Sequence, residues 1–329
     1  MQVPDFTLIR QVFPPPKEMD LYIEVLRELE ESDLLKPVRC GQKVLITAGS
    51  RGIDHIPAAL RATVDAVRRR GGEPFIMPSM GSHGGGTGLG QVEMLDHLGV
   101  TEETVSATIH REMEPREVGR CAELDSPVYA DEAALTADHI ILVNRVKEHT
   151  DYIGQTESGL LKMAVVGLGR RAGAESMHRL AVNVGCLRSI HSMARVLFEK
   201  LPVLGGVALL EDHRNRARRA EAVPVGEIFQ REPGLLAESK RFKPSLPFDS
   251  LDLLIVDEIG KEISGTGMDT KVIGRIMNIY EKEPETPRIT RIFLRSVTEA
   301  SGGNAIGIGM ADFVHCRALG RTNRSFTEI

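Results

Sequence analysis

Three histidines and one lysine are the side chains of this sequence best suited to chemistry. His83 lies in the segment MGSHGGGT, His149 in NRVKEHTDYIG, and Lys162 with His178 in ESGLLKMAVVGLGRRAGAESMH. Histidine titrates near neutral pH and binds metals, and a desolvated lysine amine becomes a nucleophile. His83 and His149 each follow an apolar run that is typical of a strand, and Lys162 and His178 come after the second run. Because catalytic groups in open α/β sheets collect beyond the carboxyl ends of the strands, this placement predicts one site.

The elements that would position these side chains alternate along the chain. The apolar runs predict strands over 41–49, 73–81, 139–145, 205–212, 251–260 and 288–297. Helical periodicity and stop signals predict helices over 56–72, 89–99, 131–138, 158–169, 174–201 and 270–282. The run over 139–145 is continuously apolar, as in a strand covered on both faces. We therefore expect an α/β protein with mainly parallel, doubly wound sheets.

A chain of 329 residues with 42% hydrophobic content is long enough for two domains. The polar segment 238–250 contains two prolines and is typical of a hinge. We place an N-terminal α/β cofactor-binding domain over 1–240 and a second α/β domain over 241–329, with the active site in the crevice between them. The chain reaches Ile329 without the elements that would close a second sheet, which predicts that this domain is incomplete at its C-terminus.

Charge and composition exclude several classes of partner. The net charge is −5, and the 41 basic and 46 acidic side chains are interspersed, so we expect no nucleic-acid or anionic-membrane surface. No run approaches the ~18 consecutive apolar residues of a membrane span. The four cysteines are scattered, without the spacing of a disulfide framework or a thiolate zinc site, and no secretory leader is visible. A soluble cytoplasmic protein is expected.

The glycine-rich segment around His83 is neither a dinucleotide fingerprint nor a phosphate loop of the Walker type. Its backbone N–H groups, at the entry to a helix near Leu89, could hold a phosphate or a carboxylate. The alternative is a glycine turn in which Thr87 caps the helix.

The chain by itself contains no complete metal site, because it lacks HExxH, clustered Cys and His, and a paired-carboxylate loop. If a metal binds, another group must supply ligands. His178 alone is either a ligand or a capping or core histidine. Lys162, among apolar neighbours, is either a buried nucleophile or a surface lysine whose stem packs on the protein.

In these motifs and in their order, the sequence resembles the lactate racemase family, the nickel-pincer nucleotide enzymes that act on 2-hydroxy acids. The resemblance covers most of the chain. It rests on G-x-H-x-x-x-T (Gly81, His83, Thr87), on His149 after the central strand, and on S-G-x-x-K (Ser158, Gly159, Lys162) followed by His178.

The resemblance implies a role for each of these residues. Lys162 would hold the nickel-pincer nucleotide through a thioamide, His178 would bind nickel, and His83 and His149 would be the two acid–base residues. Arg51 would face the substrate carboxylate or the cofactor phosphate, and Lys271 is similar in place to a substrate-binding lysine. Further cofactor contacts would come from Thr87, Ser158 and Gly159.

The implied activity is inversion of C2 in a 2-hydroxy acid. Removing the C2 hydrogen as a proton is costly beside a carboxylate, whereas removing it as hydride, while a base takes the hydroxyl proton, yields a planar keto acid. One histidine would serve each enantiomer. The partners would be a small 2-hydroxy acid and the cofactor-synthesis proteins that load the enzyme. Two alternatives stay open: an oxidoreductase or lyase that uses a diffusible nucleotide in the same crevice, and a non-catalytic nucleotide- or metabolite-binding relative.

Overall fold

The computed structural model describes residues 7–49 and 52–327, and the chain divides into two units. The larger unit comprises Glu18–Lys243 together with Ile276–Pro284. The smaller unit comprises Met1–Lys17, Pro244–Arg275 and Glu285–Ile329. The second unit is therefore assembled from three separate stretches of chain.

A six-stranded sheet forms the centre of the larger unit, in the order β3-β2-β1-β6-β7-β8. The strands are β1 (Lys43–Ala48), β2 (Glu73–Pro78), β3 (Thr108–Ile109), β6 (His139–Arg145), β7 (Val203–Glu211) and β8 (Ala217–Pro224). All neighbours pair in parallel except β8, which runs antiparallel to β7. The predicted α/β class with a mainly parallel sheet is confirmed.

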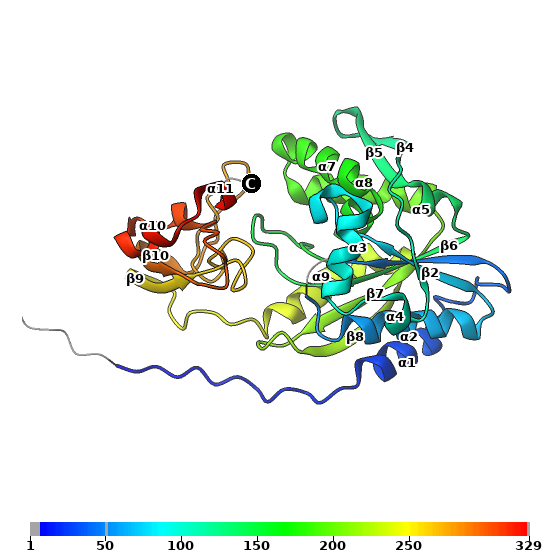
Figure 1. Ribbon diagram of the computed structural model, residues 1–329, viewed down its shortest axis with the longest axis horizontal. Helices are drawn as coiled ribbons and strands as arrows, with labels where there is room; N and C mark the ends of the chain where they lie inside the picture. The colour runs from blue at the N-terminus through cyan, green and yellow to red at the C-terminus, as the bar shows by residue number, and fades with distance from the viewer. Residues whose placement is uncertain (1–6, 50–51, 328–329) are drawn as a thin grey trace, which may run out of the picture. The chain divides into compact units, whose positions relative to one another are not determined.

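Both faces of this sheet are buried, which explains the continuous apolar runs. Val44 and Ile46 of β1 enter a core that α1 and α2 complete, whereas Leu45 enters the opposite core, which α7 and α8 complete. Figure 1 shows these two helix pairs on opposite sides of the sheet. Since successive side chains of a strand point to opposite faces, a strand with two cores must be apolar at nearly every position.

Helices connect the strands and cover the sheet. They are α1 (Leu21–Glu31), α2 (Ile56–Arg69), α3 (Gly88–His97), α4 (Glu102–Val105), α5 (Glu132–Thr136), α6 (Leu160–Lys162), α7 (Arg170–Val184), α8 (Cys186–Lys200) and α9 (Ile228–Lys240). The π-helical segment η3 (Met163–Leu168) joins α6 to α7. None of the described helices is long and apolar enough to cross a membrane.

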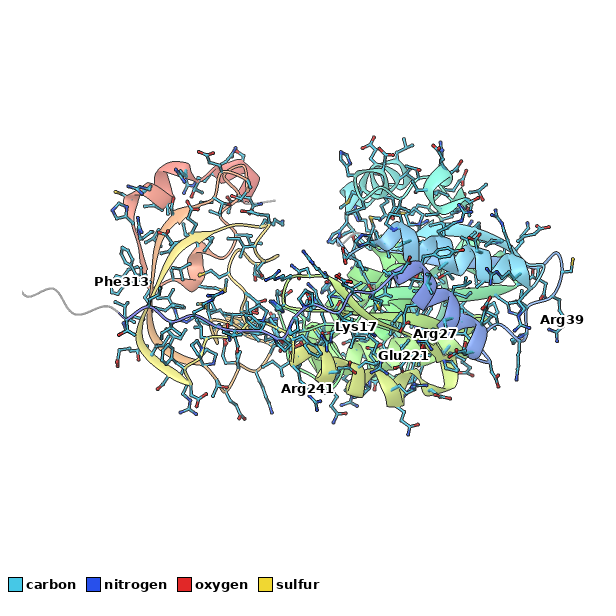
Figure 2. All side chains as sticks on the ribbon, turned by 90° about the horizontal axis from the view of Figure 1, so that it is seen from below. Lys17, Arg27, Arg39, Glu221, Arg241 and Phe313 are labelled. Carbon is cyan, nitrogen blue, oxygen red and sulfur yellow. The ribbon has the colours of Figure 1, made fainter. Side chains whose placement is uncertain are left out.

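Besides two strands of only two residues each, two strand regions have no counterpart in the sequence prediction. They are β8 and the hairpin of β4 (Pro115–Cys121) and β5 (Ser126–Asp131). In β8 the buried carboxylate of Glu221, labelled in Figure 2, pairs with Arg231 of α9 at 2.6 Å and with Arg219. The charged residues interrupt the apolar pattern from which strands are predicted, and only the fold supplies their partners.

The smaller unit contains a three-stranded parallel sheet in the order β11-β10-β9. Its strands are β9 (Ser250–Ile259), β10 (Arg288–Val297) and β11 (Phe313–Val314), followed by α10 (Cys316–Arg321) and α11 (Arg324–Thr327). Phe313, labelled in Figure 2, is exposed at the edge strand. The two long strands agree with the predicted runs over 251–260 and 288–297.

The helix predicted over 270–282 is wrong. The segment forms turns and irregular backbone, and it passes from the smaller unit to the larger one after Arg275. Gly274 and Met277 have φ of 65° and 57°, values that a right-handed helix does not contain. A Cβ at Gly274 would stand 1.8 Å from the carbonyl oxygen of Pro287. The close approach of two backbones therefore decides this segment, rather than its apolar periodicity.

Candidate functional site

The strand order of the large sheet places the candidate residues at one edge. The central strand β1 lies between β2 and β6, so the chain leaves β1 toward one side of the sheet and later returns on the other. In such a sheet, a ligand binds outside the carboxyl ends of the strands where the order reverses. The segment that carries His83 follows β2, and the segment that carries His149 follows β6. Both histidines therefore leave the carboxyl edge beside β1.

His83 lies half-buried in residues 79–87, called here the glycine loop. Gly81, Gly84, Gly85 and Gly86 all have φ between 60° and 66°. A Cβ at Gly81 would lie 2.7 Å from Val166 of η3, so this glycine is required by close packing as well as by its backbone conformation. The loop is thereby seated against the segment that follows Lys162.

Thr87 ends the glycine loop as the N-cap of α3. Its hydroxyl accepts a hydrogen bond from the N–H of Gly90 at 3.2 Å and donates one to the carbonyl of Gly84 at 3.2 Å. The alternative interpretation of this segment, a glycine turn with a threonine cap, is thus what the structure contains. A contact between Thr87 and a cofactor stays a prediction.

Arg170, the first residue of α7, ties the glycine loop to the rest of the unit. Its fully buried guanidinium donates to Asp131 Oδ2 at 3.0 Å and to Gln91 Oε1 at 2.8 Å. Gln91 in turn donates to the carbonyl oxygens of Gly81 at 2.8 Å and His83 at 3.3 Å. Burial lowers the pKa of Arg170, and the carboxylate of Asp131 opposes that shift. The backbone of His83 is therefore held by a chain of bonds that begins on the helix of His178.

His149 lies half-buried in residues 146–159, called here the β6 loop. Its backbone N–H donates to Glu157 Oε2 at 2.7 Å, and its ring stacks on Tyr152 with 4.7 Å between the ring centroids. Asp151 donates its own N–H to Nδ1 of the His149 ring at 3.1 Å. This loop therefore fixes its histidine from within.

Lys162 and His178 lie within electrostatic range of each other. Lys162 is half-buried at the end of α6, and His178 is exposed on α7. Although His178 as a whole residue is exposed, desolvation by the surrounding protein lowers its pKa; the charge of Lys162 lowers it further, and Asp151 partly offsets the shift. The imidazole is thus kept neutral near pH 7, in the form that binds metals.

Ser158 and Gly159 lie at the base of the β6 loop. The backbone of Ser158 pairs with Lys147, and the side-chain amide of Asn144 donates to the carbonyl of Gly159 at 2.7 Å. A Cβ at Gly159 would lie 2.6 Å from the carboxyl carbon of Glu232. The glycine is therefore explained by packing, and cofactor contacts of both residues stay predictions.

Glu232 of α9 is a buried carboxyl that the sequence analysis does not identify. Its Oε2 accepts the N–H of Leu161 at 3.0 Å, while Oε1 has no hydrogen-bond partner within the described part of the chain. Burial raises the pKa of Glu232 to about 7, and hydrogen bonds from the backbone of Leu161 and Leu160 limit the shift. A titratable group thus lies at the start of the helical turn that carries Lys162.

Two predicted residues, Arg51 and Lys271, stay untested as parts of this site. Arg51 lies outside the described residues. Lys271 belongs to the smaller unit, where its backbone N–H donates to Asp269 Oδ1 at 3.0 Å, so its substrate contact stays a prediction. Over residues 7–49 and 52–327, no group of three or more His, Cys, Asp or Glu side chains could hold a metal ion.

Sequence reasoning missed Gln91, Arg170, Tyr152 and Glu157, which fix the two histidine loops. Arg170 and Glu157 are fully or almost fully buried charged residues. The immediate sequence neighbours of each are glycine or polar residues, and a charged side chain is not expected to be buried. The role of Arg170 depends on partners from distant segments, whereas Tyr152 and Glu157 act mainly within their own loop.

Comparison with known proteins supports the fold assignment. No protein-family model and no curated protein matches the chain. Among solved structures, it is similar to the lactate racemase apoprotein from Thermoanaerobacterium thermosaccharolyticum, with a TM-score of 0.54 and 14% identity over 84% of this chain and 67% of that chain. The lactate racemase-like fold implied by the sequence motifs is therefore confirmed. Because only 14% of the residues are identical, this comparison supports the fold alone.

Proposed function

We propose that this protein is a racemase or epimerase that inverts C2 of a 2-hydroxy acid and uses a nickel-pincer nucleotide. The observation that supports this most is that two candidate histidines follow strands at one edge of the sheet in a lactate racemase-like fold. His83 and His149 follow β2 and β6, the two strands that flank β1, at one edge of the sheet, and Lys162 lies within electrostatic range of His178.

Lys162 and His178 fit the demands of such a cofactor. A covalent thioamide needs a lysine amine close to the metal ligand, and nickel needs a neutral imidazole. The lowered pKa of His178 supplies the neutral ring, and its exposure makes the ring accessible. When bound, the cofactor would supply the hydride acceptor that the side chains of this chain cannot provide.

The histidines would move the hydroxyl proton, one for each enantiomer. Imidazole suits this task because its pKa lies near the working pH. It can therefore accept the proton in one direction of the reaction and donate it in the other. Lys271 and Arg51 would bind the substrate carboxylate as cations, and Thr87, Ser158 and Gly159 would contact the cofactor.

Metal and mass analysis test this proposal directly. Protein made in a host that synthesises the cofactor should contain stoichiometric nickel and a covalent mass increase. We expect His178→Ala to lose the nickel and Lys162→Ala to lose the mass increase. Nickel that persists in His178→Ala would exclude this histidine as the ligand.

Turnover of the loaded protein tests the two acid–base roles. We expect His83→Ala and His149→Ala each to lose racemisation by at least ~100-fold while the cofactor absorbance is retained. Full turnover in either variant would refute the two-base scheme, and turnover without nickel would favour an enzyme that uses a diffusible nucleotide.

A further inference from the structure

The β6 loop is closed at its base and built around one carboxylate. Lys147 and Ser158 exchange two backbone hydrogen bonds, of 2.8 and 3.0 Å, which bring the two ends of the loop together. The side chain of Glu157 is 0% exposed and lies inside the closed loop. A buried carboxylate is costly unless donors surround it, so its partners indicate its role.

Glu157 accepts hydrogen bonds from several parts of the loop and from one distant cation. Oε2 accepts the N–H of His149 at 2.7 Å, and Oε1 accepts the N–H of Gly154 at 3.4 Å. Lys240 of α9 donates to Oε1 at 3.0 Å and balances the charge. One carboxylate thus holds the backbone on both sides of the turn that presents His149.

Tyr152 adds a second constraint on the histidine. Its ring is 1% exposed and stacks on the His149 ring at an interplanar angle of 30°. Its hydroxyl donates to the carbonyl of Glu157 at 2.6 Å, and burial raises the pKa of Tyr152 well above its usual value, so the hydroxyl keeps its proton. The plane of the imidazole is therefore set by a neighbour that Glu157 also holds.

The turn determines which ring nitrogen carries the proton. Nδ1 of His149 accepts the N–H of Asp151 at 3.1 Å, so the neutral ring has its proton on Nε2. The carboxylate of Asp151 lies 4.0 Å from the same Nδ1 and forms an ion pair with the ring when Nδ1 is protonated. Nδ1 therefore has a partner from Asp151 in either state, and Nε2 is the nitrogen at which a substrate proton would be exchanged.

We propose that Glu157 is a positioning residue for His149, which holds the turn so that Nδ1 faces Asp151 and Nε2 faces the substrate hydroxyl. Its catalytic meaning rests on the racemase function proposed above. The arrangement itself belongs to the chain and is present without cofactor.

Nitrogen NMR of the full-length, cofactor-free protein tests the positioning. Long-range ¹H–¹⁵N spectra of histidine-labelled protein distinguish the two neutral tautomers, and His149→Gln assigns the signal. In the unmodified chain we expect the Nε2–H tautomer of His149 to dominate. In Glu157→Gln, which cannot accept from both His149 and Lys240, we expect a mixture of tautomers, with a smaller shift in Tyr152→Phe.

Glu148→Gln is the matched control. Glu148 is a nearby carboxylate that pairs with Lys243 at 3.1 Å and with Lys240 at 3.8 Å. Its removal deletes a similar charge beside the same lysine and leaves the His149 N–H bonded to Glu157, so the tautomer should be unchanged. An equal change in both variants would mean that charge, rather than the hydrogen bond, controls the ring.

The possible outcomes separate the two proposals. A dominant Nδ1–H tautomer in the unmodified chain, or an unchanged tautomer in Glu157→Gln, would overturn the positioning role. If Glu157→Gln does not fold, the His149 tautomer in the unmodified chain and in Tyr152→Phe still tests the positioning role. In loaded enzyme we expect Glu157→Gln to lower kcat by ~10- to 100-fold and to change KM by less than ~3-fold. Absence of racemisation together with the expected tautomers would refute the function and leave the positioning intact.

Discussion

The glycine loop and the β6 loop present their histidines by opposite means. The glycine loop has few side chains of its own, and its backbone carbonyls are held from outside by Gln91, which Arg170 orients. The β6 loop contains its own acceptor, Glu157, which collects backbone N–H groups from within. One loop is fixed through carbonyls by donors, and the other through N–H groups by a carboxylate.

This difference determines what each histidine is coupled to. Because Arg170 begins α7, the backbone of His83 is linked to the helix that carries His178. The β6 loop is linked through Lys240 to α9, the helix that also contributes Glu232. Disturbing one support should therefore affect one histidine before the other. Substitutions at each support test that separation.

Arg170→Met should have the largest effect. It leaves the fully buried carboxylate of Asp131 without its cation and releases Gln91 from its fixed orientation. We expect a loss of about 3–5 kcal/mol in the free energy of unfolding, measured by chemical denaturation.

The neighbouring residue provides the control for this change. Arg171 makes an exposed pair with Glu175 at 2.7 Å on the same helix, so Arg171→Met should cost less than ~1 kcal/mol. Similar losses in the two variants would show that Arg170 is not the support of the glycine loop.

Glu232→Gln, a change on α9, should alter how the free energy of unfolding depends on pH. The pKa of Glu232 is raised from 4.5 to about 7, so between these values the unfolded chain releases the proton while the folded protein keeps it. The unfolding free energy of the unmodified protein therefore falls as pH rises through this window. The variant lacks this loss. We therefore expect its free energy of unfolding, relative to that of the unmodified protein, to rise by up to ~3 kcal/mol between about pH 5 and about pH 8.

Denaturation at several pH values checks this expectation. Glu238→Gln changes a partly exposed carboxylate of the same helix and serves as the control. A pH profile of Glu232→Gln that runs parallel to that of the unmodified protein would show that Glu232 does not titrate in this window.

Gly84→Ala and Gly85→Ala should separate steric from conformational requirements in the glycine loop. Both residues have positive φ, but a Cβ at Gly84 would lie 2.5 Å from the carbonyl carbon of Gly90, whereas a Cβ at Gly85 meets nothing within 4 Å. We expect ~1 kcal/mol of destabilisation for Gly85→Ala and about 1–2 kcal/mol more for Gly84→Ala. Equal thermal shifts would mean that the loop can move away from α3.

Much of the fold could be predicted from the sequence. The inner strands of the six-stranded sheet appear as apolar runs, because residues that enter cores on both faces must nearly all be apolar. The helix over 270–282 could not be judged this way, because a close approach to Pro287 overrides its periodicity. The strand β8 could not be predicted because charged residues interrupt its apolar pattern. Its buried Glu221 is neutralised by Arg219 of the same strand and by Arg231 of α9, and the apolar pattern of the sequence does not reveal either ion pair.

The sequence by itself determined where His83, His149, Lys162 and His178 stand relative to the ends of strands and helices, because hydrophobic periodicity and glycine placement are local properties. Only the tertiary structure decided how they are held. Burying a charge requires a partner at hydrogen-bond distance, and the opposite charges that Arg170 and Glu157 meet, Asp131 and Lys240, lie far away in the sequence and are brought near only by the fold.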